Sequence, residues 1–506
     1  MVAVRFRGMR LWTLAAALAC LVALAGCGGG GSGSSSGGGG GSTPESASAI
    51  PASAPAFISA NTDLGSSQWK QALELARRFP GFPQVLAQGR KELAKESVDF
   101  EQDVKPALGK ELALAWLDFL SADDFVAALK PDDKGKLDAL IQKAKGTKPA
   151  RGEVGDYVVL GKKQSAVASA TSAKSRLADD ATFQAAVGAL PDDALAKAYV
   201  NGAAVQAALT RRLGTSGSAS SLTKCAPSLT QNEKLDWLSA ALTAESGGVK
   251  LDGAAKVEPV PQQLTSYSAE LPKSFPEGAY AYISFAHLDS VLNPALAAVL
   301  KCQPSVRTQL SQVEAIAGFS IKNDVIPLFK NEGAVAVYPS TQPVPTIVLA
   351  LKVDDTSKAL RILDRVGALL QVSGRGSVQS VTIGGVSNAK QLKVGSFSVY
   401  YGTVGGTLAI SNRTDGLSGI GASGPKLADD SQFKAAVDGA GMPDKTSGFF
   451  YLDLKAGLSA IFGLAQRFGV VVPAEVRANT APLQSALFYG TLDGDIARLA
   501  GFVGIQ

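Results

Sequence analysis

The stretch LADDATFQAAV at residues 177–187 recurs as LADDSQFKAAV at residues 427–437. Five further short matches keep the same order along the chain, at separations of 221 to 252 residues: 57–59 with 282–284, 103–106 with 324–327, 129–133 with 351–355, 191–192 with 443–444, and 198–201 with 450–453. Chance would not preserve this order, and long-range self-similarity is the mark of an internal duplication. The 506 residues therefore predict two homologous units.

The repeated motif has a structural interpretation. Asp179 and Asp429 are expected to cap helices N-terminally, with Phe183 and Phe433 one turn further on. Other adjacent aspartates, at 132/133, 192/193 and 354/355, also precede predicted helices, where acids favour the positive end of the helix dipole. Adjacent side chains diverge by about 100° on a helix, so we interpret these pairs as caps and not as acid/base or calcium sites.

Strand and helix patterns alternate in both units. Runs rich in β-branched and aromatic residues predict strands at 238–244, 249–255, 279–285, 333–338, 346–353, 396–404, 407–411, 449–454, 486–492 and 496–503, with a hairpin at Asp493-Gly494. Amphipathic stripes predict helices at 67–78, 84–95 and 355–370. The long rhythm of a parallel sheet is missing. We expect an α+β fold: two homologous tandem units with mostly antiparallel sheets packed by helices.

The N-terminus predicts export and a lipid anchor. Arg5, Arg7 and Arg10 precede an apolar run at 11–25, which suits a signal peptide better than a membrane-spanning helix. The run ends in Leu24-Ala25-Gly26-Cys27, a sequence that resembles a bacterial lipobox, so Cys27 is the expected lipidation site. The alternative is an ordinary secretory signal that happens to hold a cysteine. Gly and Ser dominate residues 28–42, which is typical of a flexible tether.

These features divide the chain into five segments. They are a lipoprotein signal peptide at 1–26, a Gly/Ser-rich tether at 27–50, unit 1 at 51–260, a Pro-containing linker at 261–275, and unit 2 at 276–506. The signal peptide carries three arginines and no acid, so the formal net charge falls from +5 to +2 on its removal. A nearly neutral mature chain gives no argument for a nucleic-acid partner.

Cysteine and histidine are scarce. Of four cysteines, Cys225 and Cys302 remain in the predicted body, and in an exported protein they are a candidate disulfide pair, although sequence does not report the distance between them. The single histidine, His287, follows a predicted strand, and we interpret it as a surface or helix-start residue and not as a member of a catalytic triad. We expect no metal site, no cofactor and no catalytic residue.

Two glycine-rich segments match the sequence patterns of functional motifs, but their surroundings do not suit those functions. Residues 419–424 spell the dinucleotide fingerprint, but the first unit has no glycine at the equivalent loop, so we interpret the segment as a loop. Residues 33–37 match a nucleophile elbow inside the tether, which cannot supply the strain that an elbow needs.

The chain resembles the bacterial domain of unknown function 3352 family (DUF3352) in several short motifs. They are the lipobox, the tether, Pro-Ala-x-Ala-Pro at 51–55, Phe-Ile-Ser at 57–59, Asp-Val-x-Pro at 103–106 and the repeated LADD motif. The resemblance would cover nearly the whole mature chain. It implies an exported, often lipid-anchored protein, with no activity or catalytic residue to carry over.

We therefore expect no enzyme. The leading hypothesis is a lipoprotein held by Cys27 at the outer face of the cell membrane, or in the outer membrane if the cell has one, with a binding or structural role in the cell envelope. The alternative is a carrier or binder of lipids or other apolar ligands, in which the aromatic clusters at 400–401, 449–451 and 488–489 line the binding surface instead of the sheet core. A hydrolase that uses an unrecognised pair of carboxylates is a third hypothesis.

Overall fold

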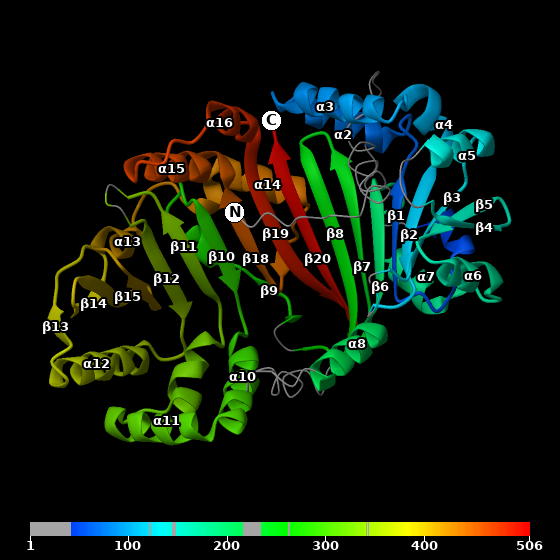
Figure 1. Cartoon of the computed structure of the whole chain (residues 1–506). Helices are drawn as coiled ribbons and strands as arrows, with labels where there is room; N and C mark the ends of the chain where they lie inside the picture. The colour runs from blue at the N-terminus through cyan, green and yellow to red at the C-terminus, as the bar shows by residue number, and fades with distance from the viewer. Residues whose placement is uncertain are drawn as a thin grey trace.

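The computed structural model describes residues 42–119, 121, 123–143, 148–215, 234–261, 264–340, 342 and 344–506. One antiparallel sheet of 18 strands runs through both units, and helices pack on its faces and along both ends of its strands (Figure 1). The α+β prediction is confirmed. In the part of the chain that the structure describes, no helix is long and apolar enough to cross a membrane.

Eight strands of the sheet come from unit 1: β1 (Ala56–Asn61), β2 (Glu111–Trp116), β3 (Phe125–Leu129), β4 (Ala150–Val154), β5 (Tyr157–Gly161), β6 (Ala196–Asn201), β7 (Lys234–Glu245) and β8 (Gly248–Glu258). Ten come from unit 2: β10 (Ala281–Phe285), β11 (Gly333–Tyr338), β12 (Thr346–Lys352), β13 (Gly376–Ser380), β14 (Ser387–Val394), β15 (Phe397–Val404), β16 (Thr407–Ser411), β18 (Gly448–Asp453), β19 (Leu483–Asp493) and β20 (Ile496–Ile505). A small second sheet pairs β9 (Tyr267–Ser268) with β17 (Lys445–Thr446).

The strand order shows the duplication directly. The pairings give the order β4-β5-β3-β2-β1-β6-β7-β8 in unit 1 and β20-β19-β18-β10-β11-β12-β16-β15-β14-β13 in unit 2. β1 and β10 therefore hold the same place, as the matched residues 57–59 and 282–284 predict.

The two units join through their last strands. β8 and β20 pair antiparallel from Gly248 opposite Gly504 to Lys256 opposite Ile496. Each of these strands begins at the closing pair of a hairpin, Glu245 with Gly248 for β8 and Asp493 with Ile496 for β20. Asp252 and Ala500 each lie four residues after that start, so they are equivalent residues. These two residues lie directly opposite each other. The junction is therefore an approximate twofold contact between equivalent strands.

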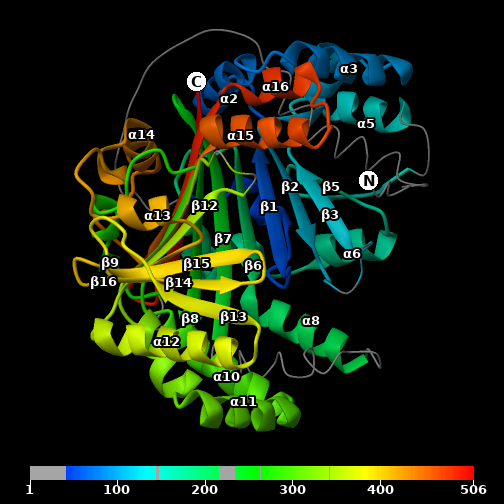
Figure 2. The ribbon, with the colours of Figure 1, turned by 90° about the vertical axis from the view of Figure 1, so that its left-hand side faces the viewer.

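The helices gather at the two ends of the strands. At one end lie α2 (Ser67–Arg77), α3 (Phe82–Lys95), α15 (Leu454–Arg467) and α16 (Ala474–Thr480), and at the other lie α8 (Gly202–Thr215), α10 (Asp289–Cys302) and α11 (Pro304–Ala317), as both views show (Figures 1 and 2). The remaining helices are α4 (Lys105–Leu108), α5 (Lys134–Lys143), α6 (Gln164–Ser172), α7 (Ala181–Gly188), α12 (Thr356–Val372), α13 (Thr414–Gly419) and α14 (Ser431–Ala440). Each end thus carries helices from both units.

The repeated motif packs one face of the sheet in each unit. The Phe183 ring meets Tyr199 edge-on at 5.0 Å, and Phe433 meets Tyr451 in the same way at 5.1 Å. Leu177 and Leu427 are fully buried beside them, in the two main cores. We call this side of the sheet the covered face.

The cap of the motif lies one residue later than expected. Leu177–Asp179 and Leu427–Asp429 each form a 3-10 turn, so the helix begins after the second aspartate. The Asp180 carboxylate accepts a hydrogen bond from the Phe183 N–H, and that of Asp430 accepts from Gln432 and Phe433. The prediction that Asp179 and Asp429 are the caps was wrong by one position.

Both linker boundaries also need correction. The expected tether, 27–50, ends earlier in its described part, because Glu45–Ala49 forms a 3-10 helix with Ala47, Ala49 and Ile50 fully buried. The expected linker, 261–275, contains the equivalent 3-10 helix Leu271–Lys273, with Leu271 and Phe275 buried. Burial of these few apolar side chains is favourable, so the otherwise Ser- and Pro-containing segments pack into the cores.

We predict that Asp430→Ala lowers the free energy of unfolding by about 1 kcal/mol, because three backbone N–H groups lose their acceptor. Asp429→Ala is the matched control: its exposed carboxylate lies 3.6 Å from Lys434, a contact worth at most a few tenths of a kcal/mol. Urea unfolding curves measure both changes. Equal effects of the two substitutions would contradict the assignment of Asp430 as the cap.

Candidate functional site

The structure locates only one of the candidate cysteines. Cys302 ends α10 and takes part in a disulfide bond. Cys225 and the lipidation candidate Cys27 lie outside the described residues, so the pairing of Cys225 with Cys302 stays a prediction, as does lipidation of Cys27.

His287 and the glycine-rich loop occupy structural positions. His287 has a φ of +54° and lies two residues before the start of α10, where its carbonyl accepts hydrogen bonds from the N–H and the hydroxyl of Ser290. The string 419–424 connects the end of α13 to the 3-10 turn at Leu427, and the Gly421 N–H donates to the Ser274 carbonyl. Both positions agree with the interpretations as a helix-start residue and a loop.

A half-buried carboxylate, Glu111, and a buried one, Glu332, could suggest acid/base chemistry, but they perform the same structural task in the two units. Glu111, at the start of β2, accepts hydrogen bonds from the N–H and the hydroxyl of Ser46. Glu332, one residue before β11, accepts from the N–H groups of Glu270 and Leu271 and pairs with Lys352 at 2.7 Å. Each glutamate therefore holds the first segment of its own unit against the sheet.

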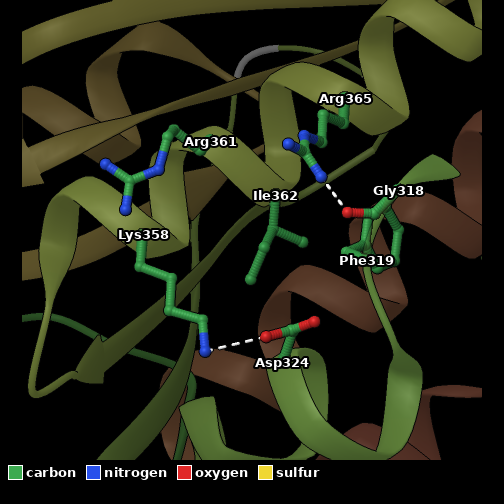
Figure 3. A pocket seen from close by; sticks show the side chains of 7 residues that line it. All are labelled: Gly318, Phe319, Asp324, Lys358, Arg361, Ile362 and Arg365. Carbon is green, nitrogen blue, oxygen red and sulfur yellow. Dashed lines mark hydrogen bonds and ion pairs between the residues drawn. The ribbon is translucent and has the colours of Figure 1, made fainter.

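A polar cavity of about 210 Å³ lies between α12 and the segment 318–324 (Figure 3). Lys358 binds Asp324 at 2.8 Å, and Arg365 donates to the Gly318 carbonyl. These contacts hold the pKa of Asp324 below its ordinary value, chiefly through the hydrogen bond from Lys358. Unit 1 repeats the ion pair between Lys143 of α5 and Asp103 at 2.7 Å. A contact that recurs in both units at equivalent aspartates is best explained as part of the scaffold.

Within the described residues, no group of three or more His, Cys, Asp or Glu side chains is placed to hold a metal ion.

The most distinctive surface is the sheet face opposite the covered face. Residues directly opposite in antiparallel strands share a face, so the register defines rows that cross ten adjacent strands from β11 to β2. The two central rows are Val335, Ile283, Phe450, Phe488, Gly501, Leu251, Leu242, Ala196, Ala60 and Leu112, and Gly333, Phe285, Gly448, Gly490, Leu499, Gly253, Ala240, Ala198, Ile58 and Leu114. Neither row contains a polar side chain. We call this surface the apolar face.

Part of the apolar face is open to solvent, and most of the residues in its two rows are half-buried. Leu499 is 49% exposed and Ile283 is 42% exposed, while Ile58, Leu238 and Leu242 are each exposed by more than a third. The buried polar residues of these strands, such as Ser59, Lys197, Ser239 and Ser284, all lie on the opposite, covered face. This distribution is the reverse of an ordinary antiparallel sheet, in which the solvated face is polar.

The aromatic clusters divide between the two faces. Phe449 and Tyr451 are buried in the core of unit 2, together with Tyr282. Phe450 lies between them in sequence and points the other way, opposite Phe488 and Ile283 on the apolar face. In the 449–451 cluster, alternate residues thus belong to the core and to the apolar face, and a role of the latter in lining a binding surface stays a prediction.

Sequence reasoning did not identify the apolar face as a whole. The signal was present in the strands, since β19 reads Ala486, Phe488, Gly490, Leu492 at every second position, and β20 reads Ala497, Leu499, Gly501, Val503. Covered-face residues between them are also largely apolar, so the pattern resembles a strand buried on both sides.

Burial raises the pKa of Glu111 above its ordinary value of 4.5, against the opposing effect of its hydrogen bonds to Ser46. A carboxyl with a raised pKa in the folded state stabilises the fold below pH 4.5, and this stability is lost as pH rises through the folded pKa. We predict that Glu111→Gln becomes more stable relative to the parent as the pH rises from 4 to 8, because only the parent loses this contribution. Urea titrations across this range measure the difference, and Glu277→Gln, at an exposed glutamate, serves as control. Parallel pH profiles for the parent and Glu111→Gln would contradict the prediction.

The search of curated proteins finds no match. Among solved structures, crystal forms IV, III and I of TP0453 match with TM-scores of 0.23, 0.23 and 0.24 and sequence identities of 10%, 10% and 12%. The matches cover 45–46% of this chain and 76–79% of TP0453.

The family model described as "Protein of unknown function (DUF3352)" matches residues 14–153 and 135–486. These two matches together span most of the chain, in keeping with the duplicated strand order. The chain belongs to the DUF3352 family of proteins of unknown function.

Proposed function

We propose that this protein is a lipid-anchored envelope protein on the extracytoplasmic side of the membrane, and that it binds an elongated apolar ligand of the acyl-chain type on its apolar face without catalysing a reaction. The observation that carries the ligand proposal is the complete absence of polar side chains from the two central rows, combined with the exposure of Leu499 and Ile283.

The energetics favour an occupant. Each fully buried Leu, Ile or Phe side chain is worth about 1.5–3 kcal/mol relative to its exposed state. A contiguous exposed apolar patch on a monomer is typical of an interaction site. Neighbouring strands lie about 4.8 Å apart, so the rows across ten strands extend for about 40 Å, enough for a long chain.

Helices at both ends of the strands border the apolar face, and this arrangement favours a narrow ligand over a broad protein partner. α2 and α15 pack against β7 and β19 at one end of the strands, and α8 packs against β7 at the other. Gly253 and Gly490 flank Leu499 on both sides, and a Cβ at Gly253 would meet its neighbours only at ordinary contact distances. Small residues thus leave room beside Leu499 for a chain to lie against the backbone.

The anchoring part of the proposal is supported by the sequence. The basic start of the chain, the short apolar run, the small residues before Cys27 and the Gly/Ser stretch after it form a consistent lipoprotein N-terminus. Two acyl chains or more give stable anchoring where one is marginal.

Ligand binding can be measured with the mature chain from residue 27, expressed with Cys27→Ser so that it carries no lipid of its own. We expect a fluorescent fatty acid to bind, and Leu499→Gln to weaken binding by about fivefold or more, because a polar amide replaces an apolar contact. Val372→Gln is the control, since Val372 is 89% exposed at the end of α12, away from the two central rows. Thermal unfolding should change little for either variant. Absence of binding by the parent, or equal binding by Leu499→Gln, would contradict the proposal.

Anchoring is tested separately in cells fed with radiolabelled palmitate. The full chain should incorporate label and fractionate with membranes, whereas Cys27→Ser should incorporate none. Cys302→Ser provides a cysteine control that should retain the label. Label that persists in Cys27→Ser would refute lipidation at this residue.

A further inference from the structure

A second apolar surface lies outside the sheet, where α15 leads into α16. We call residues 461–476 the α15–α16 corner. Six of its large apolar side chains are exposed: Ile461, Leu464, Phe468, Val470, Val471 and Val476. Phe468 is 74% exposed and Val471 is 84% exposed. Ile461, Leu464 and Phe468 follow the spacing of one helical side, so they form a stripe and not scattered positions.

Positive charge borders this stripe. Lys455, Arg467 and Arg477 are exposed on α15 and α16, against the single acid Glu475. Within the described residues, none of these three cations forms an ion pair; the Arg477 guanidinium lies 5.7 Å from the centre of the Phe462 ring. Exposed apolar side chains next to basic ones are the composition of a segment that lies in an anionic membrane interface. Two copies of the corner would instead bring like charges together.

The chain enters the folded body at the same end of the sheet. The Ser42 carbonyl accepts a hydrogen bond from Lys197 at the start of β6, and its N–H donates to Asp192. Neighbouring Asp193 accepts from Ser67, the first residue of α2. α2 lies beside α3, whose N-cap Gly81 donates its N–H to Asn479 of α16 at 2.6 Å. Ser42 and the corner therefore share one end of the sheet, through the contacts that link Ser42, α2, α3 and α16.

Chain length ties this end to the anchor. Fourteen residues lie between Cys27 and Ser42, so fifteen Cα-to-Cα steps join them. A chain of that length spans at most about 50 Å, and its average span when rich in Gly and Ser is about 20 Å. With Cys27 in a bilayer, the end of the body that carries the corner is thus held close to the membrane surface.

We propose that the α15–α16 corner docks on an anionic lipid bilayer, with Phe468, Val470 and Val471 inserted at the boundary between headgroups and acyl chains. This inference rests on the proposed function and deepens it, because α15 packs against β18 and β19 at the near end of the apolar face. Docking at the corner places that end at the bilayer, which is the source of the acyl-chain ligand.

The test uses the unlipidated mature chain with Cys27→Ser and vesicles of phosphatidylcholine with 30% phosphatidylglycerol, or of phosphatidylcholine alone. The parent should float with the anionic vesicles, and Phe468→Ser/Val471→Ser should reduce its partition coefficient by more than tenfold. Val313→Ser/Ile316→Ser is the matched control, because these side chains of α11 are 52% and 73% exposed at the opposite end of the sheet. It should stay within about twofold of the parent. Arg467→Gln should reduce the preference for anionic vesicles.

The outcomes separate this inference from the ligand proposal. Phe468→Ser/Val471→Ser should still bind the fluorescent fatty acid in the absence of vesicles, and Leu499→Gln should still float with them. The docking proposal would be overturned if the parent failed to float, or if Phe468→Ser/Val471→Ser floated as well as the parent. It would also be overturned if the parent were a dimer that bound no vesicles and dissociated on Phe468→Ser/Val471→Ser. If the parent floated with vesicles but did not bind the fatty acid, the ligand proposal would be refuted and the docking proposal would remain supported.

Discussion

The pairing of β8 with β20 is the contact on which the rest of the architecture depends. Each of these strands is the last of its unit and would be a long edge strand without the other. Unpaired edges of this length expose backbone N–H and C=O groups that invite aggregation. Pairing equivalent strands around Asp252 and Ala500 satisfies both edges at once. The geometry is that of a twofold-symmetric dimer interface, here formed within one chain.

A continuous sheet has a consequence that two separate domains would not have. Because the register is continuous from residues 237–245 of β7 through β8 and β20 to residues 486–493 of β19, side chains of both units share rows on each face. The apolar face is therefore one surface, with Leu242 and Leu251 from unit 1 and Leu499 and Phe488 from unit 2 near its centre. The twofold relation also places helices of unit 1 and unit 2 together at each end, as the Gly81–Asn479 contact shows.

The sequence predicted the duplication, the fold class and most strands of unit 2 because these depend on local periodicity and on matches that need no three-dimensional information. Gly333–Tyr338 and Thr407–Ser411 lie at the predicted positions. β13 and β14 were missed, since Ser377, Gln379 and Lys390 interrupt any apolar alternation. The caps were misplaced by one residue because either aspartate of a pair can begin a helix, and only the 3-10 turn before Asp180 and Asp430 decides between them. The apolar face depends on pairings between strands more than 200 residues apart, which no single strand reveals.

The composition of the apolar face is not explained by folding. The covered face already supplies both main cores, and it tolerates Ser59, Ser239, Ser284 and Thr243 among its buried residues. Threonine, lysine or glutamate on a solvated face would preserve strand structure at little cost and would improve solubility. Instead, ten strands present only Gly, Ala, Val, Leu, Ile and Phe in the two central rows. An apolar surface that is costly to expose, opposite a face that already supplies both main cores, is the ground on which we propose a ligand that covers it.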